Sequence, residues 1–349
     1  MLNLSVVRGP LPTQQMEEIL REFNRLTHSQ IAFAVFRRWV QEGPEGPAFH
    51  ALLTSNERVV GHFCLMRLEA EYCGKPLAVA RAEYFFVHED FRSEKVRGHE
   101  DSFLSPAILL LDQLYSHCHS IGWGPFIASS ADDIRPFHEL VGCRPLDVRL
   151  YECLLALRPV QAAVHTPNLG RPQRAALFAS SLAQATLWRG ARLIPRRQSI
   201  QPIPIEQLST LSNTHSIAFF QKPASLSWRY PHDEYLVIAD ELDPSNYLIA
   251  KKGSPERYLR VCQWCFSTPD VLPRFARALF CHAQENGMMG VRWAVFDNEP
   301  QAAALVRSLR RLAFLCVPRV RPLLVYSQDD AFLEPAIWRI SDFLFCFEL

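Results

Sequence analysis

Residues Val87–Leu110 read VHEDFRSEKVRGHEDSFLSPAILL, and this stretch joins a predicted strand to a predicted helix. The apolar run that ends at Val87 is typical of a buried strand. Ser105 and Pro106 predict a helix start, with serine as N-cap and proline at the first helical position. Because backbone N–H groups at a helix start attract anions, the junction predicts a phosphate-binding turn. Gly98 is the only glycine in it.

The loop between strand and helix carries charges of both signs. Arg92, Lys95 and Arg97 can attract a phosphate in place of the glycine-rich backbone that such loops usually have. Three acidic residues would repel a phosphate that they faced: Glu94, Glu100 and Asp101. We interpret the loop as a rebuilt phosphate site and keep the remnant of a lost site as the alternative.

The bulk properties indicate a reduced, two-domain protein. The chain has 349 residues, of which 48% are hydrophobic, and this length favours about two domains. A net charge of +1 argues against a dedicated DNA-binding protein. The ten cysteines lack the regular spacing of a disulfide framework. No signal peptide or membrane-spanning run is evident, so we expect a cytoplasmic location.

The two halves of the chain predict the same order of elements. In each half three strands precede a helix, and a strand, a helix and closing strand follow. The expected first-half strands are 2–7, 48–54, 58–68, 77–87, 125–129 and a pair within 146–157, and its helices are 12–27, 106–120 and 132–140. The expected second-half strands are 234–239, 247–252, 257–266, 291–296 and 322–326, and its helices are 268–287 and 299–312.

We therefore expect an α/β (α+β) protein of two tandem units, each a mixed, mostly antiparallel sheet flanked by helices. The predicted domains are 1–158 and 203–349, joined by a basic helical linker over 159–202. Seven arginines and no acidic residue lie between Cys153 and Ile205. This amphipathic segment fits a linker helix packed on the domains or a helix on an anionic membrane surface.

Three stretches of the first half resemble the GNAT superfamily of acyl-CoA-dependent N-acyltransferases. They are AEYFFVHEDFR (82–92), SPAILLLDQLYSHCHSIGW (105–123) and IRPFHELVGCRP (134–145). The resemblance implies that acetyl-CoA, or another acyl-CoA, is the cosubstrate. Its pyrophosphate would then lie at Val87, Arg92, Arg97, Gly98 and Ser105. The second half resembles the same fold but has no such loop, because CFSTPDVLPRF passes directly from strand to helix.

Acyl transfer to an amine requires a base and an acid. Glu83 shares a strand face with Phe85 and Val87, and the resemblance implies that a carboxylate here is the base. The alternative is a structural carboxylate paired with Arg81 or Arg67. The resemblance places the acid at His138, for which the alternative is a surface histidine.

Tyr84 and Tyr151 are further candidates for the acid. We predict no metal site from the sequence. Cys262 and Cys265 have CxxC spacing, but in a strand residues three apart face opposite sides, so we interpret them as structural.

The predicted function is N-acyl transfer, with an acetyl group as the expected acyl group, to a small-molecule or sugar amine. A Fem-type aminoacyltransferase, which also pairs two such units, is one alternative. The other is a non-catalytic binding protein of the same fold. The sequence does not determine the oligomeric state.

Overall fold

The computed structural model describes residues 1–128, 134–158, 200–208, 217–219, 222–252, 258–297 and 301–335. It also describes isolated residues between 160 and 186, and residues 299 and 338. Most of the predicted linker helix lies outside the described residues. None of the described helices is long and apolar enough to span a membrane.

The first half contains the predicted strands and helices, with one further helix, α2. Its elements are β1 (Asn3–Arg8), α1 (Thr13–Thr27), α2 (Phe33–Gln41), β2 (Phe49–Ser55), β3 (Arg58–Tyr72), β4 (Lys75–Val87), η1 (Glu89–Phe91), α3 (Pro106–Ser120), β5 (Phe126–Ala128), α4 (Arg135–Leu140) and β6 (Arg144–Ala156). The expected strand pair at the end of this half is the single strand β6.

The second half follows the same order. Its elements are β7 (Ile200–Pro202), η2 (Ile205–Gln207), β8 (Ala218–Phe219), α7 (Pro223–Arg229), β9 (Tyr235–Asp240), β10 (Tyr247–Lys251), β11 (Tyr258–Cys265), η3 (Pro269–Val271), α8 (Leu272–Glu285), β12 (Gly290–Phe296), α9 (Ala302–Arg311), β13 (Leu315–Tyr326) and η4 (Asp330–Leu333). The chain passes from β11 through one 3-10 turn into α8, as the sequence predicts.

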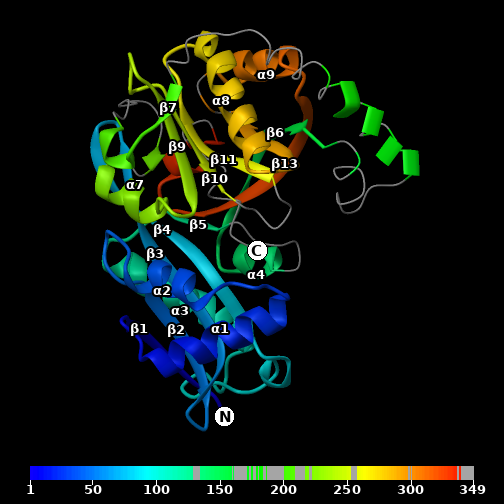
Figure 1. Ribbon diagram of the computed structural model, residues 1–349. Coiled ribbons are helices and arrows are strands. Elements are labelled where there is room, and N and C mark those ends of the chain that lie inside the picture. The colour runs from blue at the N-terminus through cyan, green and yellow to red at the C-terminus, as the bar shows by residue number, and fades with distance from the viewer. Residues whose placement is uncertain are drawn as a thin grey trace.

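One mixed sheet runs through both halves, in the order β1-β2-β3-β4-β5-β13-β6-β12-β11-β10-β9-β7 (Figure 1). The parallel pairs are β4 with β5 and β11 with β12. In each half, antiparallel strands are therefore followed by one parallel pair. This order confirms the predicted mixed, mostly antiparallel α/β fold, but the two sheets that the sequence predicted are joined into one.

The two units exchange their last strands. The first half ends in β6, which pairs with β12 of the second half, and β13 of the second half pairs with β5 of the first. The two exchanged strands also pair with each other, from Leu315↔Leu154 to Val325↔Arg144. The sheet is therefore continuous, and each unit needs a strand from the other. The division into 1–158 and 203–349 stays a proposal.

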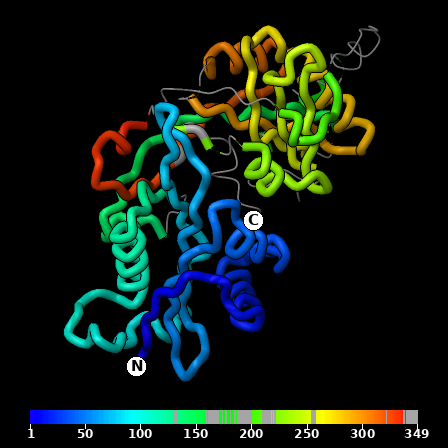
Figure 2. The backbone as a smooth tube through the Cα atoms, turned by 90° about the vertical axis from the view of Figure 1, so that its left-hand side faces the viewer, coloured from blue at the N-terminus to red at the C-terminus, as the bar shows by residue number. Residues whose placement is uncertain are grey.

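Helices cover both faces of the first unit. Helices α1 and α2 bury Ile19 and Phe36 against one face, together with Cys64 and Tyr84. Helix α3 buries Leu110 and other apolar side chains against the opposite face. The second unit lies above the first in Figure 1, with α8 and α9 on one face of its strands. Figure 2 shows the same two lobes from the side, joined by the central strands.

Candidate functional site

A β-bulge interrupts β4 at Tyr84. Along the β3–β4 ladder His62 faces Phe86, but Cys64 faces Glu83, so β4 has one residue more than β3 in this interval. Tyr84 takes up the extra length with a φ of +53°. A non-glycine residue in this region costs about 1–3 kcal/mol, and such strain is often found at functional sites. The bulge changes the direction in which the backbone N–H groups after Tyr84 point.

β4 also separates from its neighbour at this point. The β4–β5 pairing consists of Ala80↔Phe126 and Arg81↔Ile127, whereas β4 continues to Val87. In the described part of the chain, no strand pairs with β4 on this side beyond Arg81. A strand edge that is open in this way can hydrogen-bond an extended ligand that contains amides.

Glu83 lies next to the bulge on the face covered by α1 and α2. Its carboxylate forms a short ion pair with the guanidinium of Arg81, which is only 1% exposed. Burial raises the pKa of Glu83, and the charge of Arg81 opposes this effect. Arg67 instead pairs with Glu45 at 3.6 Å. Of the two structural partners that the sequence suggested for Glu83, Arg81 is the one that the structure provides.

His138 lies on the opposite face of the sheet. Its ring packs on Phe63 and Phe85, and its Nδ1 shares a hydrogen bond of 3.0 Å with the Tyr115 hydroxyl. The side chain is 3% exposed, so the alternative of a surface histidine is wrong. Burial lowers the pKa of His138 to about 4, so its imidazole is neutral at neutral pH. Glu83 and His138 thus lie on either side of β4 at the bulge.

The predicted phosphate loop is hydrogen-bonded to Leu2, the residue before β1. The Leu2 N–H donates to the Lys95 carbonyl at 2.9 Å, and the Arg97 N–H donates to the Leu2 carbonyl at 2.8 Å. Gly98 has a φ of +79°, and its N–H donates to the Glu100 carboxylate at 3.0 Å. This contact lowers the pKa of Glu100. The Glu100 carboxylate therefore occupies the Gly98 N–H, which the sequence predicted to contact a phosphate.

The other predicted cofactor residues lie at the two ends of this loop. Val87 is buried, and its carbonyl accepts a hydrogen bond of 3.2 Å from Nε of the exposed Arg92. Ser105 caps α3, as predicted, by accepting a hydrogen bond of 3.4 Å from the Ile108 N–H. The structure thus arranges Val87, Arg92, Gly98 and Ser105 along one loop, from the end of β4 to the start of α3.

Tyr151 lies apart from these residues. It is on β6, where it pairs with Val295 of β12, and its ring packs under Arg310 of α9 at 5.6 Å. It contributes to the core of the second unit. The described contacts do not link Tyr151 to Glu83 or His138.

The second half contacts the first beside α2. Arg38 of α2 pairs with Glu234 at 2.9 Å, and the rings of Trp39 and Trp228 are 4.8 Å apart. The guanidinium of Arg229 packs on the Trp39 ring at 4.8 Å. From the sequence, Trp228 and Arg229 could either stack on a ligand or pack at a hairpin entry. The structure instead packs both against Trp39 of α2, a contact between distant segments that a single sequence does not reveal.

Comparisons with known proteins find similarity in structure only. No family model matches the chain, and no curated protein matches it. A GCN5-related N-acetyltransferase from Kribbella flavida has a TM-score of 0.51 at 13% identity, over 92% of this chain and 70% of its own. One from Anabaena variabilis has a TM-score of 0.54 at 11% identity, over 92% and 72%.

An N-myristoyltransferase from Saccharomyces cerevisiae, solved with bound myristoyl-CoA, is similarly related in structure. Its TM-score is 0.55 at 10% identity, over 93% of this chain and 82% of its own. At such identities the likeness concerns the fold. It extends over 92–93% of the chain and therefore over both halves.

Proposed function

We propose, from the tandem GNAT fold that this chain has, that it transfers an acyl group from coenzyme A to an amine. The observation that carries the proposal is the bulge at Tyr84, at the point where β4 parts from β5. A thioester carbonyl placed at the bulge would meet the backbone N–H groups that follow Tyr84. Preorganised N–H groups of this kind stabilise the oxyanion that forms during acyl transfer.

The open edge of β4 and the start of α3 fit the rest of an acyl-CoA. The amide-containing arm of coenzyme A would pair with β4 between Glu83 and Val87. The pyrophosphate would then lie near Arg92, Arg97 and Gly98, at the N-terminus capped by Ser105. For this to happen, a phosphate must displace the Glu100 carboxylate from the Gly98 N–H.

In the proposed reaction the amine nitrogen attacks the thioester carbon, the C–S bond breaks and the thiolate takes a proton. Glu83, beside the bulge, would accept the proton that the attacking nitrogen loses. The imidazole of His138 is neutral at neutral pH and has no proton to give, so the departing thiolate would take its proton from water or from the protonated Glu83. We assign no step to Tyr151, because its ring packs under Arg310 in the second unit.

We propose a small-molecule or sugar amine as the acceptor, bound on the Glu83 side of the sheet. Phe63, Phe85 and His138 pack together on the other side of the bulge, which favours a short acyl group such as acetyl. A cytoplasmic location is part of the same proposal.

Isothermal titration with acetyl-CoA, myristoyl-CoA and free coenzyme A tests the proposal. We expect saturable binding of acetyl-CoA, weaker binding of the myristoyl thioester, and release of free thiol when an acceptor amine is added. Absence of binding by all three would contradict the proposal.

The contact between Glu100 and Gly98 favours a second candidate, a binding protein that has lost its cosubstrate. The Glu100→Gln variant separates the two functions. If the loop binds pyrophosphate, removal of one nearby charge should tighten acyl-CoA binding about twofold to fivefold at low salt. Glu285→Gln, an exposed site on α8, is the matched control. If neither the parent protein nor Glu100→Gln binds acyl-CoA, the non-catalytic function is favoured.

A further inference from the structure

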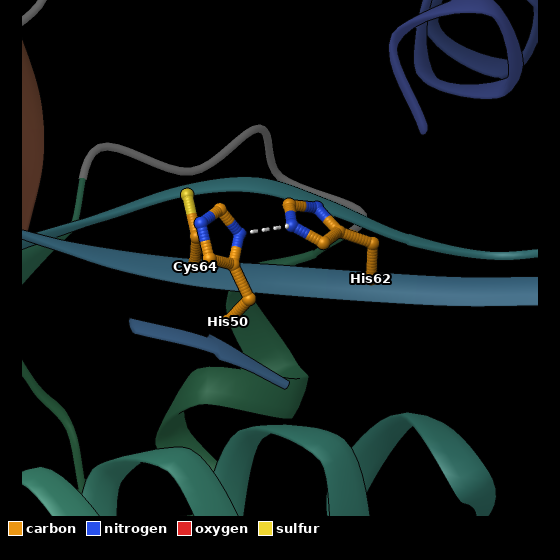
Figure 3. A group of neighbouring side chains, drawn as sticks. All are labelled: His50, His62 and Cys64. Carbon is orange, nitrogen blue, oxygen red and sulfur yellow. Dashed lines mark hydrogen bonds between the residues drawn. The ribbon is translucent and has the colours of Figure 1, made fainter. Parts of the chain in front are cut away.

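Two histidines and a cysteine meet in the core of the first unit. His50 lies on β2, and His62 and Cys64 lie on β3 (Figure 3). All three side chains are fully buried, at 0% exposure. One ligand atom from each lies within 4.8 Å of the other two.

The strand register brings these three side chains to one face. His50 is directly opposite Cys64 in the β2–β3 ladder. His62 is two residues before Cys64 on the same strand, so both side chains point the same way. The sequence analysis predicted no metal, because this pairing depends on a register that spacing along the chain does not reveal.

The hydrogen bonds of the two rings restrict their tautomers. His62 Nδ1 is 2.9 Å from the Tyr84 carbonyl oxygen and must donate to it, since a carbonyl only accepts. His62 Nε2 therefore carries a lone pair. In histidines that bind metals, the ring nitrogen that does not contact the metal typically donates its N–H to a carbonyl or carboxylate oxygen, which orients the ring.

Hydrogen bonding within the cluster leaves one polar atom unsatisfied. His50 Nδ1 and His62 Nε2 are 3.0 Å apart, so in the absence of a cation Nδ1 must be the donor. His50 Nε2 is then a buried acceptor, and it has no hydrogen-bond partner among the described residues. Buried nitrogens of this kind are uncommon and require an explanation.

The donor set fits zinc. Two imidazoles and one thiolate are typical zinc ligands, and Cu(I) or iron–sulfur sites use more sulfur. In a tetrahedral site, Zn–N bonds of about 2.0–2.1 Å and Zn–S bonds of about 2.3 Å place the ligand atoms roughly 3.3–3.6 Å apart. The present separations, up to 4.8 Å, would shorten to these values when a zinc ion binds.

We propose that His50, His62 and Cys64 form a buried zinc site. A zinc ion there would join β2 to β3, and through the His62–Tyr84 hydrogen bond it would also hold the bulge of β4. This inference stands on the cluster itself and does not depend on the proposed acyl transfer.

Metal analysis of the full chain, purified without a histidine tag, tests the site. After incubation with zinc and dialysis, we expect about one zinc ion per chain by mass spectrometry. Replacement by Co²⁺ should produce a near-ultraviolet thiolate-to-cobalt charge-transfer band. Cys64→Ser should abolish this band. It should also weaken zinc binding by at least about tenfold to a hundredfold, because even the loss of a residue that only hydrogen-bonds a metal ligand has an effect of this size.

Cys118→Ser is the matched control, because Cys118 is equally buried but lies on α3, across the sheet. It should leave both the zinc content and the cobalt band unchanged. A folded parent protein with no stoichiometric zinc and no cobalt band would overturn the proposal, and this result does not depend on whether Cys64→Ser folds. A cobalt band that persists in Cys64→Ser would also overturn it.

Discussion

His62 donates a hydrogen bond from Nδ1 to the carbonyl oxygen of Tyr84, 2.9 Å away. Tyr84 is the bulged residue of β4, with a φ of +53°. The buried His62 of β3 therefore hydrogen-bonds the strained residue of the adjacent strand. The hydrogen bond fixes the carbonyl side of the bulge. The amides after Tyr84 then keep one direction, as a preorganised oxyanion site requires.

The exchange of β13 predicts that a core residue of the second half stabilises the first unit. Leu324 is fully buried and packs with Leu110 of α3, so Leu324→Ala should lower the free energy of unfolding by about 2–5 kcal/mol. Amide hydrogen exchange should accelerate in β5 and α3. Leu309→Ala on α9 is the matched control and should accelerate exchange in the second unit instead. Unchanged exchange of the first unit in Leu324→Ala would contradict the strand exchange.

His138 makes the stability of the protein sensitive to acid. Burial lowers its pKa from 6.5 to about 4, so the unfolded chain takes up this proton first as the pH falls. The neutral ring makes its full contribution to the free energy of unfolding above about pH 6.5. This contribution is lost as the pH falls toward about 4. The titratable groups around the ring are Tyr115, Cys143 and Glu139. Burial raises the pKa of both Tyr115 and Cys143, so both stay neutral in this range.

His138→Gln keeps a hydrogen-bonding partner for Tyr115 and removes the titration. Between pH 4 and 6.5, urea unfolding of this variant should depend less on pH, by up to about 1.4 kcal/mol per pH unit. His28→Asn, at an exposed helix end, is the control and should keep the parent slope. An equal slope for His138→Gln would mean that this ring takes up its proton at the same pH in the folded and the unfolded protein, and would contradict the lowered pKa.

Arg92 and Arg97 are predicted to hold the pyrophosphate of coenzyme A. Loss of one charge-assisted contact costs about 1.5–3 kcal/mol, so Arg92→Ala or Arg97→Ala should weaken acetyl-CoA binding about tenfold to a hundredfold. Lys75→Ala, an exposed cation at the opposite end of β4, is the calorimetric control. If all three variants bind equally well, these arginines do not belong to the site.

Glu83→Gln keeps the shape of the side chain and removes its ability to accept a proton. Turnover should fall by about 10²–10⁴, while acetyl-CoA affinity stays nearly unchanged. Steady-state kinetics and calorimetry on the same preparation measure the two quantities separately. If the variant unfolds, the pairing with Arg81 is structural. Normal turnover would move the base to His88 or Glu89.

Local patterns predicted most elements of the fold. Apolar alternation predicted β2, β3 and β4, and the pair Ser105–Pro106 predicted the start of α3. Helix α2, with the sequence FAVFRRWVQ, was not predicted, although its apolar residues recur at helical spacing. The exchange of β6 and β13 could not be predicted, because both strands mix apolar and charged residues and neither pattern specifies a partner.

The candidate site was predictable only where it depends on one segment of the chain. Val87 and Ser105 lie as this continuous stretch implies. The prediction that Glu83 shares a face with Phe85 and Val87 is wrong, because the bulge at Tyr84 turns Glu83 to the face covered by α1 and α2, whereas Phe85 and Val87 pack on the α3 side. The bulge at Tyr84 and the His50–His62–Cys64 cluster depend on shifts in strand register, which a single sequence does not show. The burial of His138 depends on Phe63 and Phe85 from other strands.

Hydrogen exchange measured with and without acetyl-CoA tests the central claim most directly, because it locates the ligand as well as detecting it. We predict slower exchange at the amides of residues 83–88 and 98–109, which cover the end of β4 and the start of α3. Residues 235–251 of the second unit should be unchanged. No protection at saturating acetyl-CoA, or protection confined to the second unit, would contradict the claim that acyl-CoA binds at the β4 bulge.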